Sequence, residues 1–219
     1  MKIGVIGANG NLGARIVRRA VEQNHEVTGF VRHGNAPEGA NTVQKSLFDL
    51  KQEDLKDVDV LISAFGGGFN ADPVINRDAY MKYIELMSGT GRKLIAIAGA
   101  GSLYTDDTHT LFEYELDSHP AKLKEISKYI RQGVDEISKH DDFDWTAVCP
   151  SRFFDAEGPF TGEYLVGEKE EIIYNEDEKS YLTYEDMAQA MLDIAKDRLY
   201  PHQVITIATR TVADHSENR

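Results

Sequence analysis

The chain of 219 residues is long enough for one α/β domain with a substantial core, and it carries a net charge of −13 at neutral pH. This acidic balance argues against nucleic acids and anionic membrane surfaces as partners, because both would repel it. The single cysteine, Cys149, excludes an internal disulfide and fits a reducing cytoplasm. We therefore expect a cytoplasmic protein without a signal peptide or a membrane span, since no apolar run approaches about 20 residues.

The N-terminal segment carries the most specific signal. The apolar residues 3–6 predict a strand, and the glycines Gly7, Gly10 and Gly13 follow at once. A helical pattern of apolar residues comes directly after them, over residues 12–21. A strand, a glycine turn and a helix in this order are typical of dinucleotide binding, because the helix N-terminus attracts phosphates. The residues of this turn that we expect to contact the cofactor are Gly7, Asn9, Gly10, Asn11, Leu12 and Gly13.

The remaining chain alternates between predicted strands and helices. Strands are expected over residues 27–31, 42–44, 58–63, 94–98, 145–149 and 204–207. Helices are expected over residues 72–89, 120–137 and 184–195, and a hairpin is expected over residues 164–174. This alternation predicts an α/β fold, a Rossmann-type doubly wound parallel sheet. We expect residues 1–219 to form a single NAD(P)-binding domain, in which residues 151–219 supply a small C-terminal extension on the substrate side.

The end of the second predicted strand bears on which nucleotide binds. NAD enzymes of this type usually carry Asp or Glu there, for the ribose 2′-hydroxyl. This chain instead has Arg32 followed by His33, and a guanidinium matches a 2′-phosphate in geometry and charge. NADP(H) is therefore favoured over NAD(H), although Arg32 could also be a plain surface residue at the end of a strand.

Further cofactor contacts are expected after the other strands, because ligands of doubly wound sheets bind at the carboxyl ends of the strands. Small residues there let the backbone approach a ribose or a phosphate, and the sixth strand leads towards the nicotinamide. The expected residues are Asp49 and Leu50 beside the adenine, Ser63, Ala64, Phe65 and Gly66 after the fourth strand, Gly99 and Ala100 after the fifth, and Pro150, Ser151 and Phe153 after the sixth.

Four segments together resemble a known family. They are Ala-Gly-Ala-Gly-Ser-Leu at 98–103, Asp-Trp-Thr at 144–146 leading to Pro150, the stretch from Gly158 to Tyr164, and Ser-Tyr-Leu-Thr-Tyr-Glu-Asp-Met-Ala at 180–188. The chain resembles the NmrA-like branch of the atypical short-chain dehydrogenases, in particular its NADH-flavin reductase group, which is related to biliverdin reductase B. The resemblance spans nearly the whole chain. It implies a nicotinamide-dependent reductase and, by position, makes Ser102 a candidate catalytic residue.

One motif of the wider superfamily is missing. Its better-known members transfer protons with a Tyr-x-x-x-Lys unit, but none of the ten tyrosines here has a lysine four residues later. Reduction of a simple ketone, which needs a proton donor at the carbonyl oxygen, is therefore disfavoured. Hydride transfer to a flavin or a similar conjugated ring tolerates the absence, because the ring delocalises the arriving charge.

The acceptor pocket is harder to place. The loop over residues 103–119 is rich in polar and aromatic residues, so it forms either a wall of that pocket or a plain surface loop. The residues that we expect to contact the acceptor are Tyr104, His109, Phe112 and Arg152, the last of which pairs either with a flavin phosphate or with a nearby acid such as Asp155. The histidines show no spacing typical of a metal site, so no metal is expected.

Two other functions remain open from the sequence. A non-catalytic NAD(P)-binding redox sensor, acting through a protein partner, would also lack an acid–base pair. A nucleotide-sugar epimerase-like enzyme is less favoured, because the C-terminal part is short for a large substrate domain. The expected partner is thus a small-molecule redox acceptor, and the protein is a monomer or a homodimer.

Overall fold

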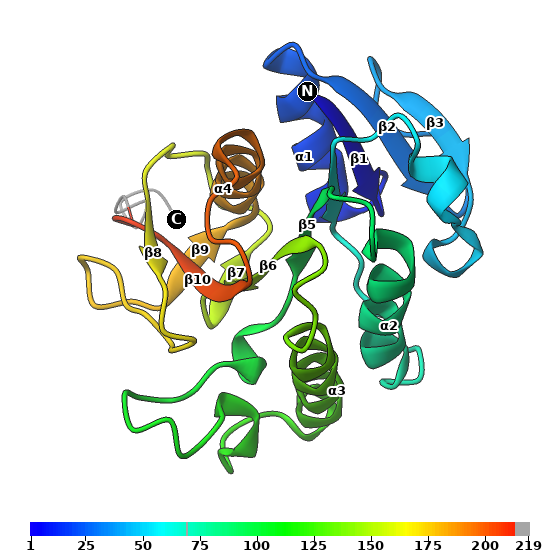
Figure 1. Cartoon of the computed structure of the whole chain (residues 1–219). Helices are drawn as coiled ribbons and strands as arrows, with labels where there is room; N and C mark the ends of the chain where they lie inside the picture. The colour runs from blue at the N-terminus through cyan, green and yellow to red at the C-terminus, as the bar shows by residue number, and fades with distance from the viewer. Residues whose placement is uncertain (69, 213–219) are drawn as a thin grey trace.

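The structure is a computed structural model, which describes residues 1–68 and 70–212. Its centre is an eight-stranded sheet in the order β3-β2-β1-β4-β5-β6-β10-β8 (Figure 1). All neighbouring strands are parallel except β8, which runs antiparallel to β10 at one edge. The strands are β1 (Lys2–Ile6), β2 (Glu26–Val31), β3 (Asn41–Gln44), β4 (Val60–Ser63), β5 (Lys93–Ile97), β6 (Asp144–Pro150), β8 (Tyr164–Gly167) and β10 (Gln203–Thr209). The predicted Rossmann-type sheet is confirmed.

Helices cover both faces of the sheet. On one face α1 (Asn11–Glu22) packs beside α4 (Tyr184–Asp197), and on the other α2 (Ile75–Met87) packs beside α3 (Ala121–Ile137). Each helix buries an apolar stripe, so the sheet lies between two separate apolar clusters. Because both faces are covered, the central strands read as continuous apolar runs in the sequence.

Of two helix starts predicted from the sequence, one is confirmed and the other lies later in the chain. The second predicted helix begins later than expected, since Asp72 stays outside α2 and its side chain accepts a hydrogen bond from the Val74 amide at 3.1 Å. The start of α4 is as expected, because the Thr183 hydroxyl caps the helix by accepting from the Asp186 amide at 2.9 Å. Two tyrosines of α2, Tyr80 and Tyr83, are buried in the core.

The predicted hairpin over residues 164–174 is wrong. Only β8 forms within it, and β8 pairs with β10 rather than with the following residues. Those residues instead bond to the distant Tyr104, whose amide donates to the Glu170 carbonyl at 2.8 Å and whose carbonyl accepts from the Ile172 amide at 3.1 Å. Both pairings join residues far apart in sequence, so the local pattern could not reveal them.

The C-terminal extension contains a second, two-stranded parallel sheet of β7 (Phe153–Asp155) and β9 (Tyr181–Thr183). Asp186, which is fully buried, anchors the adjoining loop. Its carboxylate accepts hydrogen bonds from the backbone amides of Thr161 and Gly162, and from the hydroxyls of Thr161 and Thr209, at 2.8 to 3.0 Å. These contacts join the 158–164 segment to the 180–188 segment in space.

An ion-pair bracket joins α1 to α4. The Glu185 carboxylate lies 2.9 Å from Nε of Arg15 and 2.6 Å from Nη2 of Arg19. Arg15 also donates to the Ala156 carbonyl at 2.7 Å, and the Arg19 guanidinium lies 3.6 Å from the centre of the Phe160 ring. The glycine-turn helix is thereby fixed to the C-terminal extension.

Within the described part of the chain, no helix is long and apolar enough to cross a membrane. The same residues contain no group of three or more His, Cys, Asp or Glu side chains placed to hold a metal ion.

Candidate functional site

A groove runs along the carboxyl ends of the central strands, where the strand order reverses between β1 and β4. It consists of two cavities, one of about 560 Å³ towards β2 and one of about 510 Å³ towards α3. We refer to them as the β2-side and α3-side cavities. They meet at Gly10 and at residues 64–67, which line both. The position is the one at which doubly wound sheets bind their ligands, and the size of each cavity suits a small molecule.

The glycine turn forms the start of this groove. Gly7 has a φ of +74°, and its carbonyl accepts a hydrogen bond from the Gly10 amide at 2.8 Å. A Cβ atom on Gly13 would lie only 2.0 Å from the same carbonyl oxygen, so only glycine allows α1 to pack this closely. The first turn of α1 has no side-chain cap and no acidic residue. Its free amides and partial positive charge therefore fit a pyrophosphate.

The β2-side cavity has a basic rim and an aromatic wall. Arg32 and His33 line it, as do Lys45, Ser46 and Phe48, which the sequence analysis missed. The Asn9 side chain donates to the His33 carbonyl at 2.7 Å, so the glycine turn is tied to the end of β2. Among the described residues no acidic side chain pairs with Arg32, whereas Lys45 pairs with Asp54 at 2.6 Å.

Two residues predicted to flank the adenine lie elsewhere. Asp49 is exposed, and its carboxylate accepts a hydrogen bond from the Ser46 hydroxyl at 2.6 Å. Leu50 is fully buried in the core. Neither lines the β2-side cavity, whereas Phe48 does, and its ring makes an edge-to-face contact with that of Phe65 at 5.9 Å between ring centres.

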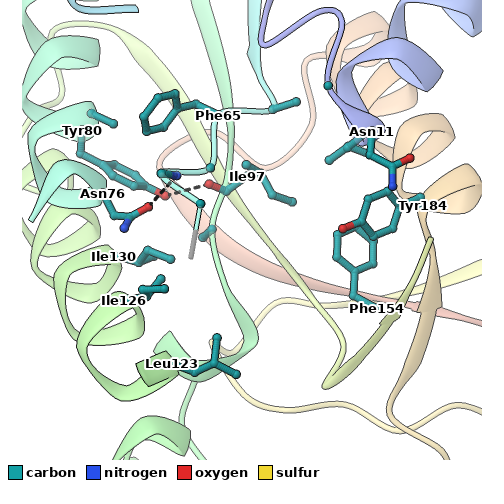
Figure 2. A pocket seen from close by; sticks show the side chains of 18 of the residues that line it. Asn11, Phe65, Asn76, Tyr80, Ile97, Leu123, Ile126, Ile130, Phe154 and Tyr184 are labelled. Atoms are coloured by element: carbon teal, nitrogen blue, oxygen red, sulfur yellow. Dashed lines mark hydrogen bonds between the residues drawn. The ribbon is translucent and has the colours of Figure 1, made fainter. Parts of the chain in front are cut away.

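The α3-side cavity has two facing walls, which Figure 2 shows. One wall is mostly apolar, and the opposite wall consists of Asn11, Phe154 and Tyr184. The side chains of the first wall are Asn76, Tyr80 and Tyr83 from α2, Ile97 from β5, and Leu123, Ile126 and Ile130 from α3. The sequence does not single out the α3 residues as cavity residues, because the same helical spacing describes a face on the core and a face on a cleft.

Hydrogen bonds hold the first wall in place. The Tyr80 hydroxyl donates to the Ile97 carbonyl at 3.3 Å, and the Tyr83 hydroxyl lies 2.7 Å from Oγ of Ser63. Burial raises the pKa of both phenols well above the usual range, so they remain neutral at physiological pH. Asn76 accepts from the Gly67 amide at 3.3 Å and so holds the glycine loop that separates the cavities.

Several predicted residues support the groove from behind. Ser102 is 1% exposed, and its hydroxyl donates to the Gly99 carbonyl at 2.7 Å. Ser151 is also buried, next to Pro150, and bonds to the Ile207 carbonyl at 2.8 Å. Gly99 and Ala100 follow the cavity-lining residue Ala98 but do not line the cavity themselves. A catalytic role for Ser102 stays a prediction.

After the sixth strand, the phenylalanine that faces the cleft is one residue later than expected. Phe153 was expected at the cofactor, but it is 61% exposed and stacks on Tyr181. The next residue, Phe154, lines the cleft instead. Successive residues of a strand point to opposite faces, and the short strand β7, which was not predicted, fixes which of the two phenylalanines faces inwards.

The aromatic residues of the 103–119 loop stack on one another. The Tyr104 ring lies between His109 at 4.4 Å and Phe112 at 4.3 Å, and the Arg131 guanidinium lies 4.9 Å from the Phe112 ring centre. None of the three rings lines either cavity. Their predicted role in acceptor binding therefore requires a site outside these cavities.

Arg152 has a partner that neither sequence alternative named. Its guanidinium donates to both carboxylate oxygens of Glu113, at 2.8 and 2.7 Å, and to the Tyr174 hydroxyl at 2.6 Å. A bidentate pair of this kind is among the stronger surface contacts. It ties the 103–119 loop to the C-terminal extension, so Asp155 is not the acid that Arg152 contacts.

Cys149 should be inert in the folded protein. The side chain is fully buried, and burial raises the pKa of its thiol to about 12. Because only the thiolate reacts readily, we expect no labelling by iodoacetamide at neutral or mildly alkaline pH, and full labelling in denaturant. Mass spectrometry of the labelled chain measures this, and stoichiometric labelling of folded protein at neutral pH would contradict it.

Comparison with known proteins agrees with this groove. A family described as NAD(P)H-binding matches residues 7–198. The uncharacterized Bacillus subtilis protein YwnB is 29% identical over 212 residues, which are 95% of this chain and 99% of that protein. A crystal structure from Streptococcus pneumoniae, named "a putative NADH-flavin reductase", is 31% identical with a TM-score of 0.88 over 95% of this chain and 99% of its own.

A more distant structure shares the fold. The anaerobilin reductase ChuY from Escherichia coli O157:H7 is 16% identical, with a TM-score of 0.72 over 97% of this chain and 99% of its own. The family match and the 31% identical Streptococcus pneumoniae structure confirm the resemblance inferred from the sequence. From the glycine turn to the end of α4, the chain belongs to the NAD(P)H-binding family.

Proposed function

We propose that this protein is an NAD(P)H-dependent oxidoreductase that reduces a flavin or a similar conjugated ring by hydride transfer. The observation that carries the proposal is the α3-side cavity. It continues directly from the glycine turn, and α3 presents Leu123, Ile126 and Ile130 to it. An apolar cleft of this kind suits a flat ring rather than a small ketone. The name of the similar Streptococcus pneumoniae protein supports the same acceptor class.

In this proposal some residues of the groove bind the cofactor, and others exclude water from the acceptor. The amides at the start of α1 would hold the pyrophosphate, and the glycine loop at residues 66–68 would leave room for the cofactor where the two cavities meet. When bound, the cofactor supplies a hydride from its nicotinamide. The apolar wall would orient the acceptor ring against the nicotinamide, within about 3–3.5 Å for hydride transfer, and would keep water out of the cleft.

NADP(H) is the proposed cofactor in preference to NAD(H). Arg32 and His33 line the β2-side cavity at the end of β2, and no acidic side chain in the described part of the chain pairs with Arg32. We expect Arg32→Ala to weaken NADPH binding by about 10- to 100-fold, and NADH binding by less than about twofold, because only NADPH has the 2′-phosphate. Quenching of protein fluorescence gives both dissociation constants.

Arg18→Ala is the matched control for this substitution, since Arg18 is an exposed arginine on α1 away from the groove. The control should leave both affinities unchanged. If Arg32→Ala weakens NADPH and NADH equally, then Arg32 does not contact the 2′-phosphate and the cofactor preference is withdrawn.

The activity is tested by mixing the purified protein with NADPH or NADH and with riboflavin or flavin mononucleotide. Loss of reduced-nicotinamide absorbance that saturates, and that requires both protein and flavin, is the expected result. Quinones and linear tetrapyrroles extend the test to other conjugated acceptors. Cofactor binding without turnover of any acceptor would refute the reductase and favour the redox sensor.

A further inference from the structure

Tyr184 is a cleft residue that neither the sequence motifs nor the glycine turn explain. It is the first residue of α4, directly after the capping residue Thr183, and it lines the α3-side cavity. Its ring lies 3.9 Å from that of Phe154, at an angle of 31°. In Figure 2 the two rings form the wall opposite α2 and α3, and the Tyr184 oxygen is on the side of the ring that faces the cavity.

The hydroxyl of Tyr184 differs from the other phenols of the cleft. Tyr80 bonds to a carbonyl and Tyr83 to a serine, so both hydroxyls are committed to the protein. Among the described residues, none forms a hydrogen bond with the Tyr184 hydroxyl. The side chain is half-buried, and its one free polar atom opens on the cavity proposed for the acceptor. A donor left free in a mostly apolar cleft is available to a ligand.

The surroundings of Tyr184 keep the phenol protonated. Burial raises its pKa above the usual value, and the positive charge of Arg15, whose guanidinium lies 5.7 Å from the ring centre, opposes part of that rise. A phenol whose pKa is raised carries its proton throughout the physiological pH range. Arg15, which also pairs with Glu185, is the positive charge next to the ring and favours the phenolate that forms when the proton leaves.

We propose that Tyr184 is the catalytic proton donor to the acceptor ring, in place of the missing Tyr-x-x-x-Lys unit. This proposal rests on the proposed function. Reduction of a neutral two-electron acceptor needs one hydride and one proton. The hydride comes from the reduced nicotinamide, which becomes oxidised, and the O–H bond of Tyr184 breaks as its proton passes to a nitrogen or oxygen of the reduced ring. Water then returns a proton to the Tyr184 phenolate, so atoms and charge balance.

The decisive variant is Tyr184→Phe, which keeps the ring against Phe154 and removes only the hydroxyl. We expect kcat with neutral flavin to fall by about 100-fold, because positioned general acids contribute a factor of this order. The dissociation constant for NADPH and the melting temperature should stay at their wild-type values. Affinity for oxidised flavin, measured by quenching of flavin fluorescence, should fall by no more than about tenfold, the effect of losing one neutral hydrogen bond.

A cationic acceptor separates proton donation from stacking. The 10-methylacridinium ion is a flat three-ring cation that becomes neutral on accepting hydride, so its reduction needs no proton. If Tyr184 donates a proton, Tyr184→Phe slows the reduction of flavin and leaves that of acridinium unchanged. Equal slowing with both acceptors, or a large loss of NADPH affinity, overturns the proposal and makes Tyr184 a binding residue.

A solvent isotope effect gives a second readout that a purely structural role would not produce. Single-turnover reduction of flavin by the wild type should be slower in D₂O, and the residual rate of Tyr184→Phe should instead rise with the concentration of acidic buffer. If the wild-type rate is the same in D₂O and in H₂O, the proposal is overturned. This test holds even if the protein does not reduce acridinium.

The control is Tyr200→Phe, which removes a phenol outside both cavities and should match the wild type in every measurement. The experiments distinguish a wrong assignment of the proton donor from a wrong assignment of the reductase activity. A wild type that reduces flavin while Tyr184→Phe does so equally well refutes only the proton donor. A wild type that reduces no conjugated acceptor refutes both.

Discussion

Replacement of Gly13 by alanine should abolish measurable cofactor binding, with a loss of at least about 100-fold in NADPH affinity. The added Cβ would lie 2.0 Å from the Gly7 carbonyl oxygen and 2.7 Å from its carbon, and both atoms belong to the backbone. Either the turn or α1 must move, and the amides that face the pyrophosphate move with it. Overpacking of this kind also costs about 1–3 kcal/mol of stability, so the melting temperature should fall.

Gly66→Ala provides the comparison for stability, because a Cβ at Gly66 has no atom within 4 Å and its φ is not positive. Its melting temperature should equal that of the wild type. Fluorescence titration with NADPH measures the affinity of each protein, and a thermal melt measures its melting temperature. Wild-type NADPH affinity in Gly13→Ala would show that the pyrophosphate is not held at this turn.

The second large effect is expected at Asp186, where Asp186→Asn should lower stability by about 3 kcal/mol. The buried carboxylate accepts four hydrogen bonds, and an amide would turn an NH₂ group towards donors that need an acceptor. For a chain of this length the change corresponds to about 6–12 °C in melting temperature. Activity should fall as well, because Tyr184 lies in the same first turn of α4.

Asp197→Asn, at the exposed end of the same helix, makes the equivalent change outside any such network. Thermal melts of both variants beside the wild type give the difference directly. Equal melting temperatures for the two variants would mean that the loop around Thr161 does not depend on the Asp186 carboxylate.

The parts of the site that the sequence revealed are those with local causes. The glycine turn could be predicted because Gly7, Gly10 and Gly13 act within one turn of backbone, between a strand and a helix that are both readable nearby. The same holds for Arg32, which follows a clear strand. The cap of α4 by Thr183 also depends on residues three positions apart.

The parts that the sequence did not reveal depend on distant contacts or on orientation. Composition shows that the 103–119 loop is aromatic, but not that Tyr104, His109 and Phe112 stack on one another instead of on a ligand. Tyr184 belonged to a motif that supported the resemblance, yet nothing in the motif says that its hydroxyl has no partner. Phe153 and Phe154 differ only in which face of a three-residue strand they occupy.

The ion-pair bracket has a consequence for how the protein reaches its working form. Arg19 and Glu185 are 166 positions apart, so the wall that carries Tyr184 can attach to the glycine-turn helix only after residues 19 to 185 have all been synthesised. Contacts between such distant positions form late in folding, because the loop between them must close first. The groove is therefore complete only when both halves of this fold are in place, and a nucleotide bound across it would stabilise the two halves together.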